Sequence, residues 1–300
     1  MKIGAMTCCW NEQTTIAYTI SSLLPFVDTY VVVDTGSDDH TLKIIKTLFE
    51  NELSSGKLIL IEYGFLEDYD ISKPKNKAIE ALRAEGCERF IRLDADDVFY
   101  FEGAEKAVKK ARDLPYNVTM FTINHWELYQ NKYENSIDWT DGLIEEAAGH
   151  KKPEFLCMRI PPSFDGRFTG SYGHARIYRT EGAISLGKWT DEAWGTGPGE
   201  DIGHPKHRRR CIGDPSEDIV HYGWARPMDK KMRKNNIWTQ GKDVDLRVTG
   251  LETRWEVIDK PNLDRITYGI NWWPKQILFP FTKHPEVVHN LAPTVRELLI

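Results

Sequence analysis

The feature of this chain that most constrains its fold is an alternation of short apolar runs and amphipathic segments over residues 1–97. The segments carry apolar side chains at helical spacing, and the four apolar runs lie at residues 2–8, 30–33, 58–61 and 89–93. Short apolar runs that alternate with helices are typical of buried parallel strands, because each parallel pair needs a crossover connection. The sequence therefore predicts an α/β fold with a Rossmann-like, mostly parallel sheet and helices on both faces.

Polar side chains follow three of the four predicted strands. Asn11 and Glu12 come after the first strand, Asp34 ends the second, and Asp94 and Asp96 follow the fourth. The carboxyl ends of parallel strands share one edge of a sheet, and open α/β sheets bind their ligands there. We therefore expect these residues to contribute to a single site.

The segment with the most specific chemistry is Leu93-Asp94-Ala95-Asp96-Asp97. In extended geometry, Asp94 and Asp96 lie on the same side of the chain. Two hard oxygen donors suit Mg²⁺ or Mn²⁺ together with a diphosphate. An Asp-rich turn with a helix cap is the alternative, because aspartate is common after strands.

Two nucleotide-binding motifs are absent. No Gly-x-Gly-x-x-Gly follows the first strand, which argues against a dinucleotide cofactor, and no Gly-x-x-x-x-Gly-Lys-[Ser/Thr] is present, which argues against a phosphate-loop ATPase. A sugar-phosphate nucleotidyltransferase would need a Gly-rich, Arg-containing loop after the first strand. Residues 8–12 are not such a loop.

The composition restricts the class of protein further. The chain has 300 residues and a formal net charge of −6, so the molecule as a whole is not suited to bind polyanions. Its five cysteines are scattered and odd in number, which favours a reducing compartment over a disulfide framework. Neither a signal peptide nor an apolar stretch of transmembrane length is evident, so we expect a cytoplasmic protein.

Four motifs occur in an order and spacing that resemble the family 2 glycosyltransferases of GT-A fold. They are Asn11-Glu12 after the first strand, Val31–Thr41, Lys75–Ala78 and Leu93–Asp97. The resemblance implies a nucleotide-diphospho-sugar donor, usually a UDP-sugar, and a divalent metal ion, Mn²⁺ or Mg²⁺. It also implies transfer of the sugar to an acceptor hydroxyl with inversion.

The resemblance assigns roles to residues at the predicted sheet edge. Asp34 would contact the base, usually uracil. Asp94 would lie near the ribose and the metal ion, and Asp96 would ligate the metal ion. The residues that would line the nucleoside pocket are Trp10, Asn11 and Glu12.

Two departures from the family pattern bear on the donor site. Cys8 and Cys9 stand where the family often has proline and a polar residue, and Lys75-Asn76 stands where Arg-Asn is common. Lys75 keeps the positive charge for a phosphate or nucleotide contact, but it lacks the bidentate fork of arginine.

The second half of the chain resembles one branch of the same family. The matching segments are the strand Ala175–Arg179, the pair Asp191-Glu192, and His221-Tyr222-Gly223 with a basic helix after it. The branch has His-Glu where this chain has Asp191-Glu192, which is a departure.

The Asp191-Glu192 pair contains the expected general base, which must lie on the face of the sugar opposite the leaving diphosphate. The resemblance favours Glu192, with Asp191 as the other choice. The rings of Trp189 and Trp194 would raise the pKa of a carboxylate between them, which suits proton abstraction. A solvated acidic turn is the alternative interpretation.

His221 is the expected third metal ligand, because two aspartates alone hold a divalent ion weakly. One alternative is a buried histidine bonded to a backbone carbonyl. Another is a zinc site formed with His204, His207 and Cys211, whose spacing lacks the usual paired knuckle.

Basic residues near His221 have two interpretations. On the predicted helix Met228–Trp238, Lys231 and Arg233 would clamp the donor phosphates by resemblance, or form a solvated face. The run Lys206–Arg210 is a solvated loop, or a contact to a diphosphate or an anionic acceptor. The acceptor stays open among a protein side chain, a glycan, a lipid-linked glycan and a modified nucleic acid.

The expected organisation has three parts. Residues 1–115 form the nucleotide-sugar-binding half, residues 116–225 an irregular acceptor-side and catalytic half, and residues 226–300 a basic helix with an aromatic tail. A non-catalytic nucleotide-sugar binding module is the alternative from another functional class. Such a module would keep Asp34 and Asp96 but would not depend on Glu192.

Overall fold

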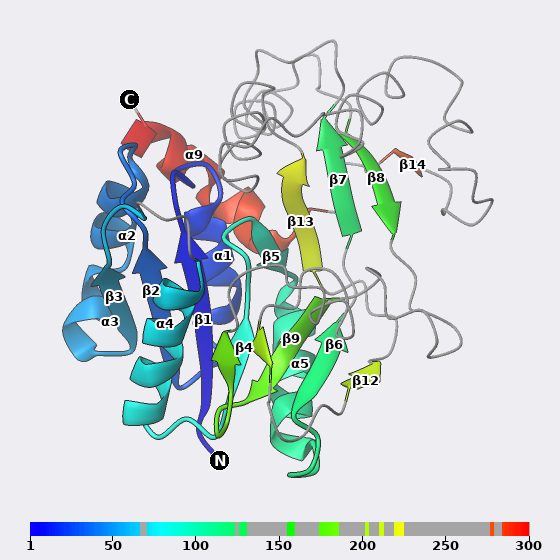
Figure 1. Cartoon of the computed structure of the whole chain (residues 1–300). Coiled ribbons are helices and arrows are strands. Elements are labelled where there is room, and N and C mark those ends of the chain that lie inside the picture. Colours follow the sequence, from blue (N-terminus) through cyan, green and yellow to red (C-terminus); the bar gives the residue numbers. More distant parts are fainter. Residues whose placement is uncertain are drawn as a thin grey trace, which may run out of the picture.

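A computed structural model describes most of the first half of the chain and shorter segments of the second. The described residues are 1–66, 71–123, 126–130, 155–159, 174–185, 202–203, 210–212, 219–224, 277–278 and 284–299. They form a central sheet, a second sheet beside it, and helices on both faces of the central sheet (Figure 1). No helix in this described part is long and apolar enough to cross a lipid bilayer.

The central sheet is mostly parallel, as the sequence predicts. Its seven strands are β1 (Ile3–Cys9), β2 (Thr29–Asp34), β3 (Leu58–Glu62), β4 (Arg89–Arg92), β6 (Met120–Ile123), β9 (His174–Arg179) and β12 (Arg210–Ile212). Their order is β12-β6-β9-β4-β1-β2-β3. β9 runs antiparallel to both of its neighbours, and all other pairs are parallel.

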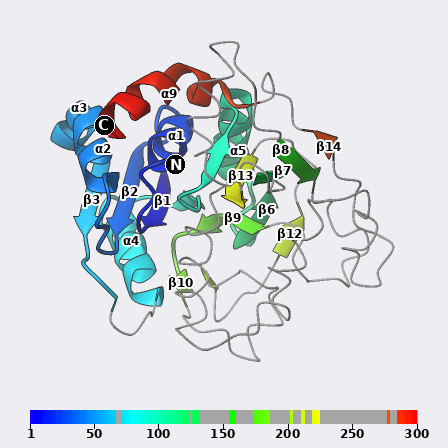
Figure 2. The same cartoon turned by 90° about the horizontal axis from the view of Figure 1, so that it is seen from above.

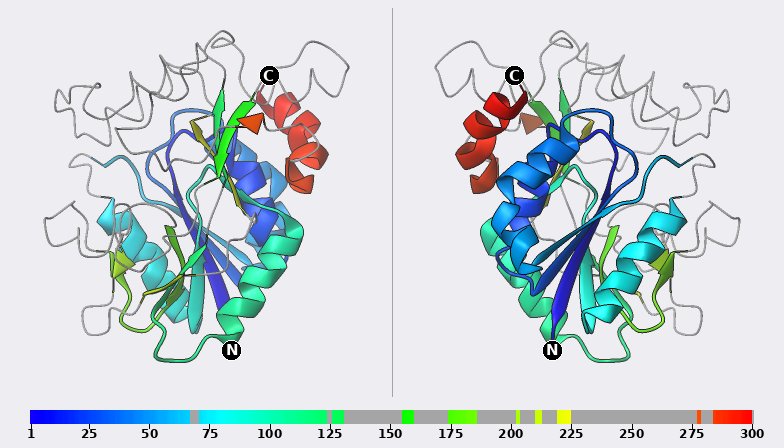
Figure 3. Two further views of the ribbon diagram at one scale, coloured as in Figure 1. Left: turned by 90° about the vertical axis from the view of Figure 1, so that its right-hand side faces the viewer. Right: turned by 90° about the vertical axis from the view of Figure 1, so that its left-hand side faces the viewer.

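Helices cover both faces of this sheet. They are α1 (Ile16–Leu23), α2 (Thr41–Leu48), α3 (Glu50–Ser55), α4 (Ser72–Ala84), α5 (Phe101–Asp113) and α9 (Glu286–Leu299). Successive strand residues point to opposite faces. Met6 and Val31 therefore pack with α4, whereas Ala5 and Val32 belong to the apolar cluster that includes α1, α5 and α9. Figures 2 and 3 show α4 on one face and α1, α5 and α9 on the other.

The second sheet has the order β14-β8-β7-β13-β5. Its strands are β5 (Asp97–Phe99), β7 (Trp126–Gln130), β8 (Phe155–Arg159), β13 (Ile219–Trp224) and β14 (Ile277–Leu278). A separate two-stranded sheet joins β10 (Ile184–Ser185) to β11 (Ile202–Gly203). In Figure 1, β13, β7 and β8 stand at the end of the molecule toward which β1 points. The second sheet therefore borders the carboxyl edge of the central sheet.

Helix α9 brings the end of the described chain back to its beginning. Its buried residues Val287, Val288 and Val295 pack against the cluster that contains α1. Just before the helix, the ring of His284 stacks on Tyr222 of β13, and Tyr222 Oη lies 2.6 Å from His284 Nδ1. Burial lowers the pKa of His284 to about 3, so this ring is neutral at pH 7. The neutral ring of His284 therefore connects the start of α9 to β13.

Two local expectations differ from the structure. The apolar pattern predicts one helix over residues 42–53, but α2 and α3 are separate because Phe49 leaves the helical region, with φ −120° and ψ 29°. The ring of Phe49 is buried in the core at the residue where α2 and α3 are interrupted. The sequence pattern also misses α9, because Pro293 lies inside it. The expected basic helix 228–238 lies outside the described residues, and the three-part division of the chain stays a prediction.

Candidate active site at the carboxyl edge of the sheet

The aspartate segment forms a tight turn between β4 and β5. The backbone N–H of Asp97 donates to the carbonyl of Asp94 at 3.0 Å, and the N–H of Asp94 donates to Asp97 Oδ2 at 3.0 Å. The segment is therefore a turn and not the extended chain in which Asp94 and Asp96 are expected to lie on the same side. The strand before this turn ends at Arg92.

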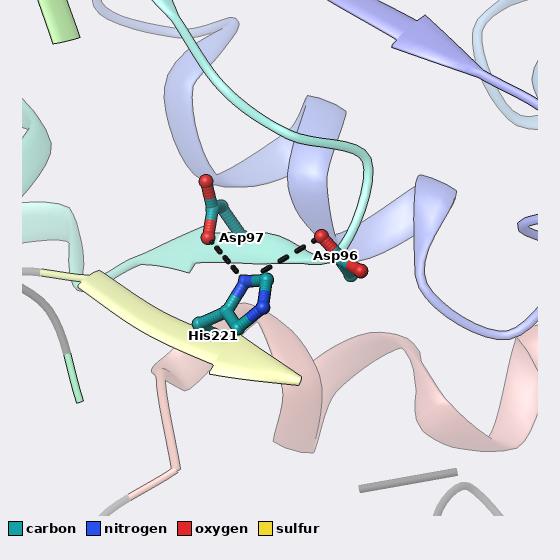
Figure 4. A group of neighbouring side chains, drawn as sticks. All are labelled: Asp96, Asp97 and His221. Carbon is teal, nitrogen blue, oxygen red and sulfur yellow. Dashed lines mark hydrogen bonds and ion pairs between the residues drawn. The ribbon is translucent and has the colours of Figure 1, made fainter. Parts of the chain in front are cut away.

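Asp97 and His221 lie opposite each other on paired strands. β13 runs antiparallel to β5, and its register places His221 against Asp97. Directly opposed residues of an antiparallel pair have neighbouring side chains. His221 Nδ1 lies 2.9 Å from Asp97 Oδ1 and 3.5 Å from Asp96 Oδ1 (Figure 4). The second sheet thus brings a histidine from the far half of the chain to the aspartate turn.

The donor atoms of Asp96, Asp97 and His221 fit a divalent metal ion. One possible ligand atom from each residue lies within 4.8 Å of the other two. Carboxylate oxygens suit Mg²⁺ and Mn²⁺, and an imidazole nitrogen is a common ligand of transition metals. The turn is also held against β13, because Tyr222 N–H donates to the carbonyl of Asp96 at 2.8 Å.

Two buried arginines offset the negative charge of the aspartate turn. Arg176 is fully buried, and its two terminal nitrogens lie 3.1 Å from Asp94 Oδ2 and 2.7 Å from Asp97 Oδ2. Arg92 Nη2 lies 3.3 Å from Asp94 Oδ1. Burying a charge is costly unless it is paired and hydrogen-bonded, and these guanidinium groups supply that pairing. Three aspartates against two arginines leave a net negative charge, which suits a cation.

The outcome for the expected metal ligands is mixed. Asp96 and His221 come together, and both belong to the cluster that fits a metal ion. The third member of that cluster is Asp97, which the sequence pattern does not single out. Asp94 is instead partly exposed and flanked by Arg92 and Arg176, so its contact with a metal ion or a ribose stays a prediction.

Asp34 is the last residue of β2, and its side chain is buried at the turn that begins there. Its Oδ1 accepts from the backbone N–H groups of Gly36 at 3.0 Å and Ser37 at 2.9 Å. Its Oδ2 accepts from the Ser37 hydroxyl at 2.5 Å and from the Cys9 thiol at 3.6 Å. Burial raises the pKa of Cys9, and the charge of Asp34 raises it further, so the thiol stays protonated. The expected base contact of Asp34 stays a prediction.

Gly36 allows this turn to pack closely on the loop after β3. Its φ is +89°, a left-handed conformation that other residues rarely adopt. A Cβ at this position would lie 2.7 Å from the backbone nitrogen of Phe65. Glycine is therefore required at Gly36 for two independent reasons.

The loops after β1 and β2 are tied together by side chains. Asn11 N–H donates to Ser37 Oγ at 2.9 Å, and the Asn11 side chain exchanges two hydrogen bonds with Asp38. Glu12 N–H donates to Thr41 Oγ1 at 2.8 Å. The Glu12 carboxylate is buried and accepts from Thr15 Oγ1 at 2.9 Å, at the start of α1.

These contacts give Asn11 and Glu12 a structural role at the predicted pocket. Trp10 is partly buried beside them, at the end of β1. Their expected part in binding a nucleoside stays a prediction.

Asn76 carries a structural role that the sequence pattern alone does not show. Its side-chain oxygen accepts from Ser185 N–H at 2.8 Å, and its amide nitrogen donates to the Ser185 carbonyl at 3.1 Å. This two-way bond joins α4 to β10. Lys75 precedes it on the same helix and is partly buried. The phosphate contact expected of Lys75 stays a prediction.

Several expected site residues lie outside the part of the chain that the structure describes. These are the catalytic pair Asp191-Glu192, the phosphate-binding candidates Lys231 and Arg233, and the basic run Lys206–Arg210. The same holds for His204 and His207 of the alternative zinc site, and the side chain of Cys211 is likewise not described. Arg176 is the principal described site residue to which the sequence pattern assigns no role, although its strand belongs to the recognised motif.

Comparison with known proteins identifies the family of this chain. The model of glycosyl transferase family 2 matches residues 5–186, which is more than half of the chain. The chain therefore belongs to glycosyl transferase family 2 and is a glycosyltransferase. A search of curated proteins found no match.

Solved structures of glycosyltransferases resemble the chain at low sequence identity. Residues 1–349 of TarS from S. aureus are 15% identical, with 90% of this chain and 76% of that chain covered and a TM-score of 0.41. Mannosyltransferase PcManGT from Pyrobaculum calidifontis, in complex with GDP-Man and Mn²⁺, is 21% identical, with 41% and 35% covered and a TM-score of 0.34. Glucosyl-3-phosphoglycerate synthase from Mycobacterium tuberculosis is 15% identical, with 60% and 57% covered and a TM-score of 0.31.

Proposed function

We propose that this glycosyltransferase moves a sugar from a UDP-sugar to an acceptor hydroxyl, with inversion, and that it depends on Mn²⁺ or Mg²⁺. The observation that carries the proposal is the meeting of Asp96, Asp97 and His221 at the carboxyl edge of the sheet. Family membership supports the reaction class. The site also lies at the edge where open α/β sheets bind nucleotides.

Asp96 and His221 are the residues proposed to hold the ion. When bound, a divalent ion neutralises the charge that develops on the leaving diphosphate. Arg176 and Arg92 offset two of the three aspartate charges, and the remaining negative charge attracts the cation. The site would therefore hold the diphosphate poorly without the ion.

Asp34 is proposed to recognise the base of the donor. Its oxygens already accept hydrogen bonds from Gly36, Ser37 and Cys9. A base N–H that reaches the carboxylate would therefore have to replace the Ser37 hydroxyl, which is the donor that can rotate away. Trp10, Asn11 and Glu12 are proposed to line the same pocket.

Glu192 is proposed to accept the proton of the acceptor hydroxyl, with Asp191 as the second choice. Lys231 and Arg233 are proposed to contact the donor phosphates, together with Lys75. The resemblance to one branch of the family supports the roles of Glu192, Lys231 and Arg233, and the resemblance to the family as a whole supports that of Lys75. Because Glu192 would act on the acceptor, it need not contribute to donor binding.

Calorimetry of the metal dependence tests the donor site. UDP should bind the wild-type chain with Mn²⁺ or Mg²⁺ present and far more weakly in EDTA, because the ion joins the diphosphate to Asp96 and His221. A thermal-shift screen of nucleotide sugars with Mn²⁺ would identify the donor, since a bound ligand stabilises the fold by mass action. Equal UDP affinity in Mn²⁺ and in EDTA would overturn the proposed metal dependence.

Glu192→Gln tests the proposed base separately from donor binding. The transfer rate should fall by roughly 10²–10⁴-fold, the usual contribution of a general base, while UDP-sugar affinity stays nearly unchanged. Asp191→Asn is the matched control and should keep a rate close to wild type. Normal turnover of Glu192→Gln together with an inactive Asp191→Asn would transfer the role to Asp191.

A further inference from the structure

A cavity of about 520 Å³ lies at the edge of the central sheet opposite the candidate active site. It is lined by residues from the end of α4, the start of β4, the segment after α5 and the turn after β9. This edge holds the amino end of β1, which is marked N in Figure 1, whereas the aspartate turn follows the carboxyl end of β4. A cavity of this size can hold a small-molecule ligand.

Two buried arginines lie opposite each other on paired strands at this cavity. β9 runs antiparallel to β4, and its register places Arg179 directly opposite Arg89. The two side chains are only 9% and 2% exposed. Like charges that lie directly opposite each other on paired strands are destabilising. Burial lowers the pKa of Arg89, and the charge of Arg179 lowers it further.

Within the described part of the chain, no carboxylate lies within ion-pair distance of either arginine. Arg89 donates from its terminal nitrogens to three backbone carbonyls of the segment 114–118. Arg179 donates to the backbone carbonyls of Tyr116 and Glu181. Both guanidinium groups thus have hydrogen bonds but no counter-charge. Because a buried charge is costly unless it is paired, the cavity favours an anion.

The other charged groups that line the cavity do not remove this excess of positive charge. Arg83 contributes a third guanidinium, which also donates to backbone carbonyls. The Glu181 carboxylate accepts from the Tyr116 hydroxyl. The Glu88 side chain is 61% exposed and lies 3.7 Å from the amino group of Met1. Three guanidinium groups against two carboxylates, one of them largely in solvent, leave the cavity positively charged.

Thr180 and Tyr116 add a hydrogen-bonding group and an aromatic ring to the same cavity. Thr180 is 2% exposed, and its hydroxyl has no hydrogen-bond partner among the described residues. A buried hydroxyl without a partner costs free energy, which a bond to a ligand oxygen would recover. Tyr116 is 68% exposed, and its ring packs on the Arg179 guanidinium at 4.4 Å. An exposed ring of this kind can stack on a planar group of a ligand.

We propose that this cavity is a second ligand site, which binds a small molecule that carries a phosphate group and a planar ring. A phosphate monoester carries about −1.5 to −2 charge at pH 7, which offsets Arg89 and Arg179 together. Guanidinium groups match the geometry of phosphate oxygens. The Thr180 hydroxyl donates to the phosphate, and the ring of the ligand stacks on Tyr116. A carboxylate ligand, with a single charge, would leave one of the two buried arginines uncompensated.

Fluorine nuclear magnetic resonance of the full chain, labelled with 3-fluorotyrosine, locates the binding of phenyl phosphate. The signals of Tyr116 and Tyr63 are assigned by their loss in Tyr116→Phe and Tyr63→Phe. Tyr116 reports on the cavity, and Tyr63, whose backbone N–H donates to the Asp34 carbonyl, reports on the proposed donor site. In EDTA, phenyl phosphate should shift the Tyr116 signal saturably and leave that of Tyr63 unchanged. Phenol, which lacks the phosphate, should shift neither signal.

Three variants test which side chains hold the phosphate. Arg179→Gln and Arg83→Gln should each weaken the binding of phenyl phosphate by about 10–100-fold, as expected for the loss of a hydrogen bond to a charged group. Arg112→Gln is the matched control, because Arg112 is an exposed arginine of α5 outside the cavity, and it should keep the wild-type affinity. Circular dichroism checks that each variant is folded. Because Arg83 is exposed, Arg83→Gln tests the site even if Arg179→Gln does not fold.

The outcomes separate this site from the proposed function. A saturable shift of Tyr116 that Arg83→Gln weakens and Arg112→Gln does not would support the cavity as a phosphate site. A shift of Tyr63 alone would place the phosphate at the donor site, which overturns the second site and leaves the proposed function intact. If Tyr116 shows no saturable shift, or if Arg112→Gln weakens binding as much as Arg83→Gln, the cavity does not recognise phosphate.

Discussion

The proposed nucleoside side of this site, formed by the loops after β1 and β2, is built differently from its proposed metal side, formed by the aspartate turn with Arg176 and His221. On the nucleoside side, Asn11 contacts Ser37 and Glu12 contacts Thr41, across 26 and 29 residues of sequence. On the metal side, Asp97 meets His221 across 124 residues, and Asp94 meets Arg176 across 82. The first set connects neighbouring parallel strands, whereas the second depends on the antiparallel strands β9 and β13.

The two sides therefore depend on different parts of the fold. The polar groups of the Asp34 turn are satisfied by donors from the turn itself and from β1, so this side is complete when β1 and β2 pair. The metal side is complete only when β9 and β13 bring Arg176 and His221 to the aspartate turn. Substitutions on the metal side should therefore change ion dependence and global stability, and those on the nucleoside side should have local effects.

The largest effect is expected from Asp96→Asn. A neutral amide is a poor ligand for a hard cation, so UDP affinity in Mn²⁺ should fall to the value measured in EDTA. Loss of an ion that supplies several kcal/mol should lower the transfer rate by on the order of 10³-fold. Calorimetry and a transfer assay check the two effects.

Asp113→Asn is the matched control for Asp96→Asn, because Asp113 is an exposed aspartate at the end of α5. It should keep the wild-type response to Mn²⁺. His221→Ala should resemble Asp96→Asn, since both residues are proposed to hold the same ion. If Asp96→Asn kept the full Mn²⁺-dependent affinity for UDP, Asp96 would not hold the ion, and the proposed metal side would be wrong.

The next largest effect is expected from Arg176→Met and concerns stability. Removing one partner of a buried ion pair leaves the other charge uncompensated, which typically costs ~3–5 kcal/mol of unfolding free energy. Asp97 is the partner left behind, with no solvent exposure. Urea denaturation would measure the change. The double variant Arg176→Met with Asp97→Asn should recover part of the loss, because the buried charge is then absent.

Arg83→Met is the control for Arg176→Met. Arg83 is exposed, and it donates to the backbone carbonyls of Thr180 and Ala183 rather than to a buried carboxylate. Its loss should be smaller, about 1 kcal/mol, as for ordinary hydrogen bonds. A similar loss in both variants would show that the ion pair of Arg176 has no special part in the fold.

The sequence is sufficient to predict β1 to β4 and the sheet edge at which they end, because the cues for both are local. Apolar runs identify β1 to β4, and polar residues at their ends identify the edge where Asp34 and the aspartate turn lie. The family motif adds His221, which the structure places beside Asp96. These inferences need only strand periodicity and the parallel order of neighbouring strands.

The rest of the site depends on pairings that no local pattern encodes. The tight turn at residues 94–97 directs Asp97 toward β13, and extended geometry does not foresee this. Arg176 lies on β9, which pairs antiparallel with both β4 and β6. This pairing is determined by the tertiary fold and not by the local sequence. Helix α9 lies in the region for which the sequence predicts an aromatic tail, and proline inside a helix, here Pro293, disfavours a helix prediction. The positions of Asp97 and Arg176 thus depend on long-range strand pairing, which a local sequence pattern does not predict.

The smallest effect is expected from Ser37→Ala, which tests whether the nucleoside side is independent of the metal side. The variant loses the hydroxyl that donates to Asp34 and accepts from Asn11 N–H, so the unfolding free energy should fall by about 1 kcal/mol. Ser55→Ala, at an exposed serine bonded to the carbonyl of Glu52, is the control and should cost less.

UDP affinity of Ser37→Ala gives the sharper measurement, because the Ser37 hydroxyl occupies the Asp34 oxygen that a base N–H would need. Two changes oppose each other: the carboxylate becomes available to the base, while the loop loses a tie to Asn11. Affinity in Mn²⁺ should therefore change by less than about threefold, which is under ~0.7 kcal/mol. The ratio of affinities in Mn²⁺ and EDTA should stay at the wild-type value, since no metal-side contact is touched. A changed ratio would show that the Asp34 turn and the aspartate turn act as one unit, and the comparison between the two sides would then fail.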